Sequence, residues 1–122
     1  WNAFENAIMR LVPNENKGGS PFTNDQGEVE VARARVQIHY IQHDCFVDGE
    51  AILNAVKILA HIPTVIVQGR YDMVCPPKSA WELSKAMPHA EFYIIQDAGH
   101  SAMETGITSA LVAATERFKL LS

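Results

Sequence analysis

The chain of 122 residues is 48% hydrophobic and carries a formal net charge of -4. This composition is typical of one globular unit, and it excludes both a disordered chain and a basic nucleic-acid-binding surface. No apolar run approaches the roughly 20 residues of a membrane span, and no basic segment with an apolar core opens the chain as a secretion signal would. We therefore expect a cytoplasmic protein with no nucleic-acid or membrane partner, whose two cysteines, Cys45 and Cys75, are reduced thiols.

The first third of the chain predicts two helices. Residues 1–12 place apolar side chains on one side, and Pro13 ends this helix. Because the chain opens on a tryptophan within this pattern, we expect further sequence upstream. Turn-forming residues at 14–21 predict a surface loop. Residues 28–42 fit either a helical face or an alternating strand, and we favour the helix.

The remainder predicts alternating helices and strands. Two short runs rich in β-branched and aromatic residues are typical of buried parallel strands, and proline residues delimit the helix between them. The predicted elements are a helix at 49–60, a strand at 64–69, a helix at 77–87, a strand at 90–96 and a helix at 106–121. A single βαβα unit of a mostly parallel sheet leaves sheet edges uncovered. We therefore expect the chain either to associate, with itself or another chain, or to expose an apolar edge at residues 64–69.

Each predicted strand is closely followed by a reactive side chain. Asp72 follows the first strand, and His100 follows the second. Because ligands bind at the carboxyl ends of parallel strands, the two side chains can meet there although 28 positions separate them. An aspartate and a histidine in this order are the acid and the base that the C-terminal part of an α/β-hydrolase supplies to a catalytic triad. The alternative is that Asp72 caps a turn and His100 lies in a surface loop.

The sequence offers no convincing nucleophile for this pair. Residues 99–103 begin like the G-x-S-x-G elbow of hydrolases, but Met103 replaces the second glycine, and Ser101 directly adjoins His100. Cys75 is interpreted as a partly buried packing thiol. Glu104 either forms a local hydrogen bond or faces water. We therefore expect the nucleophilic serine to lie outside this chain.

These residues resemble the C-terminal part of the proline iminopeptidases, which are prolyl aminopeptidases of the α/β-hydrolase fold. The resemblance is most specific in Gly-Arg-Tyr-Asp-Met-Val-Cys-Pro at 69–76 and Ala-Gly-His-Ser-Ala-Met-Glu at 98–104. Residues 1–5 are similar to the family's Trp-x-x-Trp-Glu segment, and residues 34–40 to its Ala-Arg-x-Glu-Asn-His-Tyr segment. The likeness covers nearly the whole chain and is weakest between residues 13 and 27.

The resemblance implies that residues 1–46 are the end of a helical cap and that residues 47–122 are the C-terminal part of the hydrolase core. Two cap glutamates of this family bind the free amino terminus of the substrate. Glu5 matches one of them, whereas Gln37 takes the place of the other. A glutamine accepts a hydrogen bond from an ammonium group but brings no charge, and charge-assisted bonds are roughly twice as strong. This departure weakens the expectation of strict prolyl specificity.

The function implied is a serine aminopeptidase that releases N-terminal proline from peptides or amino-acid amides through an acyl-enzyme. His100 acts as general base and then acid, Asp72 orients it, and Glu5 and Gln37 line the amine subsite. No cofactor or metal is implied, and the expected partner is the N-terminal half of the hydrolase. Two alternatives remain: an esterase or amidase of other specificity, and a non-catalytic fragment or small βαβ binding module.

Overall fold

The computed structural model describes residues 2–12 and 24–121. Its α-helices are α1 (Asn2–Ile8), α2 (Asn24–Gln42), α3 (Gly49–Ala55), α4 (Pro77–Ala86) and α5 (Thr105–Phe118), and its strands are β1 (Val65–Gly69) and β2 (Glu91–Ile95). Three short 3-10 helices are η1 (Asp44–Phe46), η2 (Val56–Leu59) and η3 (Lys119–Leu121). The predicted alternation of helices and strands is therefore confirmed in the part of the chain that is described. The loop predicted at residues 14–21 lies outside it.

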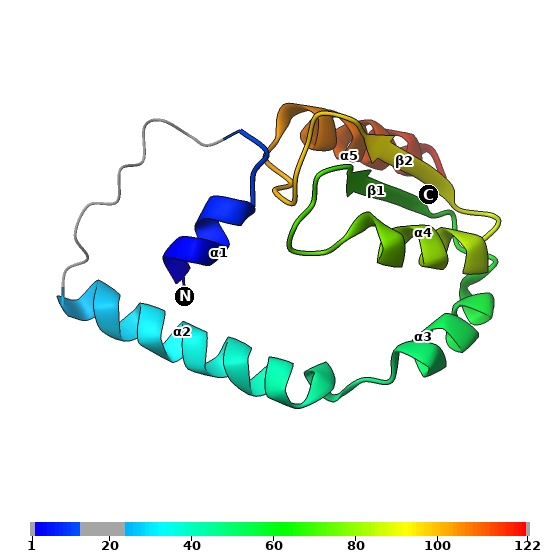
Figure 1. Cartoon of the computed structure of the whole chain (residues 1–122). Coiled ribbons are helices and arrows are strands. Elements are labelled where there is room, and N and C mark those ends of the chain that lie inside the picture. The colour runs from blue at the N-terminus through cyan, green and yellow to red at the C-terminus, as the bar shows by residue number, and fades with distance from the viewer. Residues whose placement is uncertain (1, 13–23, 122) are drawn as a thin grey trace.

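The two strands form a parallel sheet whose register brings both carboxyl ends to the same level. Val65 pairs with Glu91 at one end and Gly69 pairs with Ile95 at the other. Helix α4 connects the strands on one side of the sheet, and α5 packs behind the sheet in this view (Figure 1). Pro77 occupies the first turn of α4, where its fixed φ angle and missing N–H are tolerated. The loops after β1 and β2 consequently leave the sheet at one edge.

Helix α1 is shorter than the sequence predicts. The apolar pattern extends to Val12, but the helix ends at Ile8. The carbonyl of Met9 accepts hydrogen bonds from the backbone N–H groups of His100 and Ser101. A contact with a loop about 90 positions away therefore satisfies this group, and the helix ends five positions before the proline.

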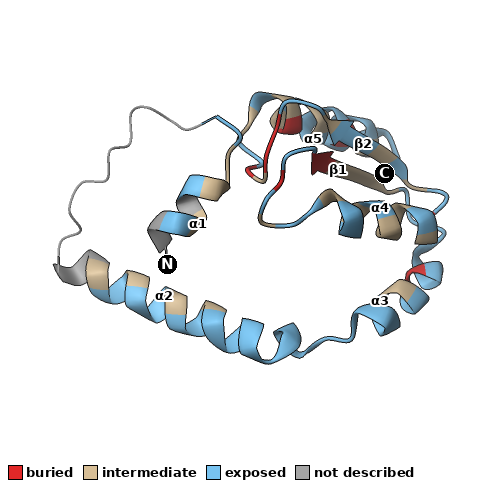
Figure 2. Ribbon diagram, viewed as in Figure 1, coloured by how far each residue is buried: buried red, intermediate tan, exposed pale blue. Residues whose placement is uncertain are grey.

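Helix α2 confirms the helical interpretation of residues 28–42 and begins earlier, at Asn24. Its apolar residues do not form a buried face, because Val29, Val36 and Tyr40 are 50% or more exposed. In the described residues α2 runs apart from the sheet and carries mainly exposed side chains (Figures 1 and 2). Periodicity identified the helix but not what covers it.

The core is small and lies around the sheet and the loops at its carboxyl edge (Figure 2). The buried hydrophobic residues are Val56, Met87, Ala98, Ile107 and Ala114, and the buried polar residues are Gln68, Asp72 and Ser101. The predicted helix at 49–60 is α-helical to Ala55 and then tightens into η2. Its predicted apolar face is only partly buried, since Ile52 and Leu59 are exposed.

The uncovered edge of the sheet differs in detail from expectation. Among the described residues β1 pairs only with β2, so one backbone edge of β1 has no strand partner. Its residues, however, are half-buried or buried from Val65 to Gly69. The exposed apolar side chains lie mostly on the helices instead. No helix in the described ranges is both long and apolar enough to cross a lipid bilayer.

Candidate active site

Asp72 and His100 meet at the carboxyl edge of the sheet. Nδ1 of His100 lies 2.9 Å from Oδ2 of Asp72, within the range of a hydrogen bond. A carboxylate can only accept, so Nδ1 carries the proton and the neutral imidazole keeps Nε2 as its unprotonated nitrogen. Asp72 is 7% exposed and the His100 side chain 31% exposed. The pair therefore has a buried acid and an imidazole that solvent can reach.

A turn after β1 holds the Asp72 carboxylate in place. Oδ1 accepts the backbone N–H of Val74 at 2.9 Å and that of Cys75 at 2.7 Å. On the other side, Nε2 of Gln68 donates to Oδ2 at 3.3 Å. The same Gln68 amide contacts the carbonyl oxygens of Gly69 and Cys75, both at 3.1 Å. The acid is thus oriented by donors on both oxygens and has little freedom to turn away from the imidazole.

These donors lower the pKa of Asp72 from its ordinary value. Burial is the largest influence and by itself raises the pKa, because it disfavours the charged form. The N–H of Cys75, the His100 side chain and the N–H of Val74 stabilise the carboxylate and together outweigh burial. Asp72 is therefore ionised at neutral pH, as a group that orients an imidazole and stabilises its cation must be.

The His100 loop packs tightly on the turn after β1. The N–H groups of Arg70 and Tyr71 donate to the carbonyls of Ile95 and Ala98, at 2.9 and 3.0 Å. A Cβ atom on Gly69 would lie 1.9 Å from the carbonyl oxygen of Gly99, which no side chain tolerates. Gly69 is thus required for the two backbones to approach closely enough for the Asp72 contact.

The loop is also joined to the segment that follows α1. The N–H groups of His100 and Ser101 both donate to the Met9 carbonyl, at 2.9 and 2.8 Å. A Cβ on Gly99 would lie 2.9 Å from the backbone nitrogen of Leu11. The position of His100 therefore depends on residues from the opposite end of the chain.

Neither in-chain nucleophile candidate suits the role. Ser101 is 6% exposed, and its Oγ accepts the N–H of Met103 at 3.3 Å. Cys75 is more exposed than the expected packing role implies. Partial desolvation and the nearby Asp72 carboxylate raise the pKa of Cys75, which leaves little of the reactive thiolate.

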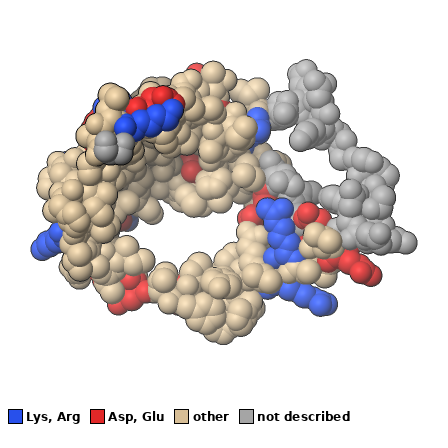
Figure 3. Space-filling model, turned by 180° about the vertical axis from the view of Figure 1, so that it is seen from behind, with Lys and Arg blue, Asp and Glu red and all other residues tan. Residues whose placement is uncertain are grey.

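The two predicted amine-binding residues also meet. Nε2 of Gln37 on α2 donates to Oε2 of Glu5 on α1 at 2.6 Å, and both side chains are half-buried. They line a hollow of about 590 Å³ together with Arg33, Val36 and Tyr40. The space-filling view shows a wide opening in the described part of the chain, between the sheet and α2 (Figure 3). Helix α1 carries Glu5, which contacts Gln37. The residues just after α1 include Met9, which contacts the His100 loop.

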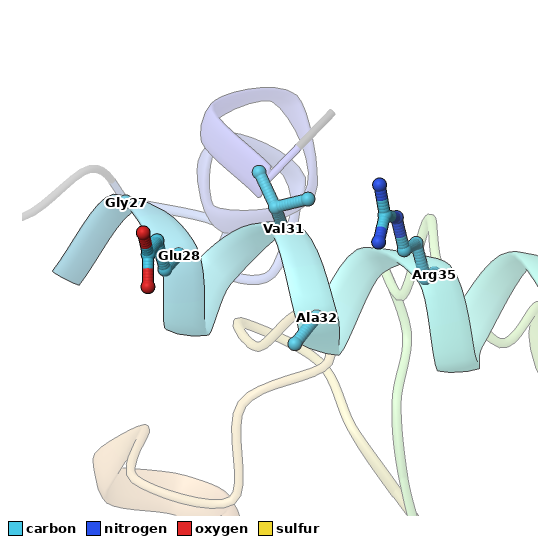
Figure 4. Close-up of a pocket in the computed structure, with 5 residues that line it drawn as sticks. All are labelled: Gly27, Glu28, Val31, Ala32 and Arg35. Carbon is cyan, nitrogen blue, oxygen red and sulfur yellow. The ribbon is translucent and has the colours of Figure 1, made fainter. Parts of the chain in front are cut away.

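A larger hollow, of about 720 Å³, lies elsewhere. The described residues that line it lie on α2: Gly27, Glu28, Val31, Ala32 and Arg35 (Figure 4). It contains none of the four predicted site residues. The described part of its lining includes neither Asp72 nor His100, so size alone does not make it the functional site. No cluster of three or more potential metal ligands occurs among the described residues.

Sequence reasoning missed several groups that build this site. Gln68 is a polar residue at the end of an apolar strand, and that contrast was a usable signal. Gly69 is the first residue of the recognised motif at 69–76, and a glycine at a strand end signals close backbone approach, but the sequence analysis gave it no role. The Met9 carbonyl had no signal, because every residue carries one.

The comparisons with known proteins agree with this geometry. Residues 6–107 match the family model of the alpha/beta hydrolase fold. The chain is 47% identical over 119 residues to a protein of Leptolyngbya boryana named probable proline iminopeptidase, covering 97% of this chain and 36% of that protein. It is 42% identical to a proline iminopeptidase of Arabidopsis thaliana, covering 99% and 31%, and 41% identical to one of Neisseria gonorrhoeae, covering 95% and 35%. The chain therefore spans about a third of these relatives, and the resemblance to proline iminopeptidases is confirmed.

Proposed function

This chain belongs to the α/β-hydrolase fold family, and on that premise we propose that it is the C-terminal part of a serine aminopeptidase that releases N-terminal proline from peptides or amino-acid amides. In this proposal residues 1–46 end a helical cap and residues 47–122 complete the hydrolase core. The nucleophilic serine lies outside this chain, and the enzyme is cytoplasmic.

One observation carries the proposal, namely the 2.9 Å contact between Asp72 and His100, which follow two neighbouring parallel strands. Chain order supports it, because α/β-hydrolases place the acid before the histidine and the serine before both. The names of the relatives supply the substrate class.

The proposed mechanism follows the geometry of the pair. Nε2 of His100 takes the proton of the serine hydroxyl as its oxygen attacks the carbonyl carbon of the N-terminal residue. Asp72 accepts the Nδ1–H bond throughout and stabilises the imidazolium. His100 then returns the proton to the leaving amine, which leaves an acyl-enzyme. Water, deprotonated by the same Nε2, releases the amino acid and restores the serine.

The proposed amine subsite lies between α1 and α2. The substrate ammonium group binds Glu5, whose carboxylate supplies the negative charge. Gln37 contributes its side-chain carbonyl oxygen as a second acceptor, and its Nε2 lies 2.6 Å from Oε2 of Glu5. A substrate ammonium group can replace that contact.

The expected partner in this enzyme is the rest of the hydrolase. Its sheet would continue along the free edge of β1, and its bulk would cover apolar side chains on α2 that are exposed here. If that covering is absent, we expect self-association through the same surfaces.

The neutral Gln37 favours a second candidate function. A subsite with one carboxylate instead of two binds an ammonium group less strongly, so the enzyme can act on esters or amides that lack a free N-terminal proline. The two candidates share the triad and differ in the substrates cleaved.

We expect the isolated chain to be inactive, because loss of the triad serine leaves only residual catalysis. A chimera, in which this chain replaces the matching 119-residue region of the Leptolyngbya boryana protein, should cleave a chromogenic prolyl anilide. An N-acetylated prolyl anilide is the control and should not be cleaved. Cleavage of simple esters but not of the prolyl substrate would favour the second candidate. Turnover by the isolated chain would overturn the assignment of an external serine, and a folded chimera inactive on both substrates would overturn the proposal.

The substitution Gln37→Glu should raise kcat/KM of this chimera roughly tenfold for prolyl substrates with a free amine. The gain corresponds to about 1 to 2 kcal/mol, the difference between a neutral and a charge-assisted hydrogen bond. Steady-state kinetics at neutral pH measure it. At lower pH the gain should shrink, because adjacent carboxylates repel and one of them binds a proton instead of the substrate.

Gln42→Glu is the matched control for this change. It introduces the same charge on α2, at the last and exposed position of the helix. It should leave kcat/KM within twofold of the parent. Equal changes with free and N-acetylated substrates in the Gln37 variant would contradict the proposed subsite.

A further inference from the structure

We propose that Glu104 is a positioning residue of this active site, which holds the His100 loop against the segment after α1 through both oxygens of its carboxylate. The catalytic consequence of this inference rests on the proposed function. The contact itself is independent of it. Glu104 touches neither Asp72 nor His100 in the contacts described. Its influence on the reaction passes through the backbone of the loop.

The carboxylate of Glu104 bridges two backbone N–H groups far apart in the sequence. Oε1 accepts the N–H of Gly99, the residue before His100, at 2.9 Å. Oε2 accepts the N–H of Leu11 at a longer 3.4 Å. Glu104 itself is half-buried, so water screens these bonds only in part. One side chain thus joins the histidine loop to Leu11, which lies 93 positions before Glu104.

The backbone of Glu104 is fixed independently of this bridge. Its N–H donates to the carbonyl of Ser101 at 3.0 Å, and its carbonyl accepts the N–H of Thr108 at 2.9 Å as α5 begins. Glu104 occupies the cap position of that helix, yet its side chain makes no capping hydrogen bond. The carboxylate is therefore directed to the loop, from a rigid base at the start of a helix of 14 residues.

The bridge adds a second attachment between the loop and the segment after α1. The carbonyl of Met9 already accepts from His100 and Ser101, and the Glu104 carboxylate adds contacts to Leu11 and Gly99. The backbone N–H groups of three consecutive residues, Gly99, His100 and Ser101, are thus all bonded. Without the carboxylate, the N–H of Gly99 loses its acceptor, and only the Met9 carbonyl joins the loop to that segment in the contacts described.

This attachment has a consequence for catalysis. Helix α1 carries Glu5, and the segment after it carries Met9 and Leu11. A change in the position of α1 is therefore transmitted to the His100 loop, and displacements of about 1 Å in a catalytic group can cost about 100-fold in rate. Glu104 thus couples the amine subsite to the base, and its loss should lower kcat more than it raises KM.

Three variants separate this role from a purely structural one. Glu104→Gln keeps the size but replaces one acceptor oxygen by a donor, so it cannot accept both N–H groups. Glu104→Asp keeps the charge near the start of α5 but shortens the reach. Glu116→Gln is the matched control, because this exposed carboxylate lies on the same helix and pairs only locally with Lys119 among the contacts described.

The first readout is amide hydrogen exchange in the 122-residue chain, followed by NMR. In Glu104→Gln and Glu104→Asp we expect the Gly99 and Leu11 amides to exchange at least tenfold faster than in the parent. The amide of Ala114 in α5 should be unchanged, and Glu116→Gln should match the parent throughout. Equal exchange of Gly99 and Leu11 in parent and variants, for any reason, would overturn the bridge.

The second readout is catalytic, in the chimera described above. We expect Glu104→Gln to lower kcat about 10- to 100-fold with KM within twofold, and the Nδ1 proton resonance of His100 to broaden or disappear. If Glu104→Asp retains full activity, charge alone matters and the positioning role is wrong. If the parent chimera lacks prolyl activity while the exchange result holds, the proposed function fails and the Glu104 bridge stands. If activity is present and the exchange result fails, the Glu104 bridge is wrong and the proposed function stands.

Discussion

Asp72→Asn should lower kcat of the chimera by about 10⁴-fold while leaving the fold intact. The asparagine can still accept the N–H groups of Val74 and Cys75 through its oxygen, so the turn after β1 is kept. Its NH₂ group would then face Nδ1 of His100 and donate to it. The imidazole would have to carry its proton on Nε2, which is the nitrogen that accepts the serine proton in the proposed mechanism. A loss of this size is what the wrong tautomer costs in serine hydrolases.

Steady-state kinetics and circular dichroism test this expectation together. Asp97→Asn is the matched control, because Asp97 is an exposed aspartate in the loop that carries His100. It removes the same charge and should leave kcat within twofold. A loss of less than tenfold in the Asp72 variant, with the secondary structure unchanged, would show that Asp72 is not the acid of a triad.

Gly69→Ala should destabilise the chain by about 3 kcal/mol, which is large for the addition of one methyl group. The new Cβ would lie 1.9 Å from the carbonyl oxygen of Gly99 and 2.8 Å from that of Ala98. Both obstacles are backbone atoms, so no side-chain rotation relieves the overlap. The His100 loop must move away from β1, and the contact between Asp72 and His100 should lengthen with it.

Urea unfolding followed by circular dichroism measures the free energy of unfolding in this case. Gly27→Ala is the matched control, because nothing lies within 4 Å of a Cβ at that position inside α2. There the alanine should stabilise the chain by about 0.5 to 1 kcal/mol, the usual gain over glycine in a helix. If Gly69→Ala is as stable as the parent, the close approach of the two loops is wrong.

The sequence by itself determined the order of the elements and indicated that Asp72 and His100 lie at the same sheet edge. The two apolar runs before Asp72 and His100 predict parallel strands, and side chains that follow neighbouring parallel strands reach the same sheet edge. Pro77 and Pro88 delimit α4 because proline fits the first turn of a helix and cannot continue one. These signals depend on local backbone geometry, which is written in short stretches of sequence.

Only the tertiary structure decided how the site is held. Just after the end of α1 the Met9 carbonyl bonds to the His100 loop, and the Glu104 carboxylate reaches the same segment at Leu11. The apolar side of α2 looked like a core face and is exposed in the described structure. Periodicity indicates that one side of a helix is apolar. Which residues pack against that side is decided by parts of the chain far away in sequence. Hydrogen bonds to backbone groups leave no residue pattern at all, because every residue offers the same acceptor carbonyl and, except for proline, the same donor N–H.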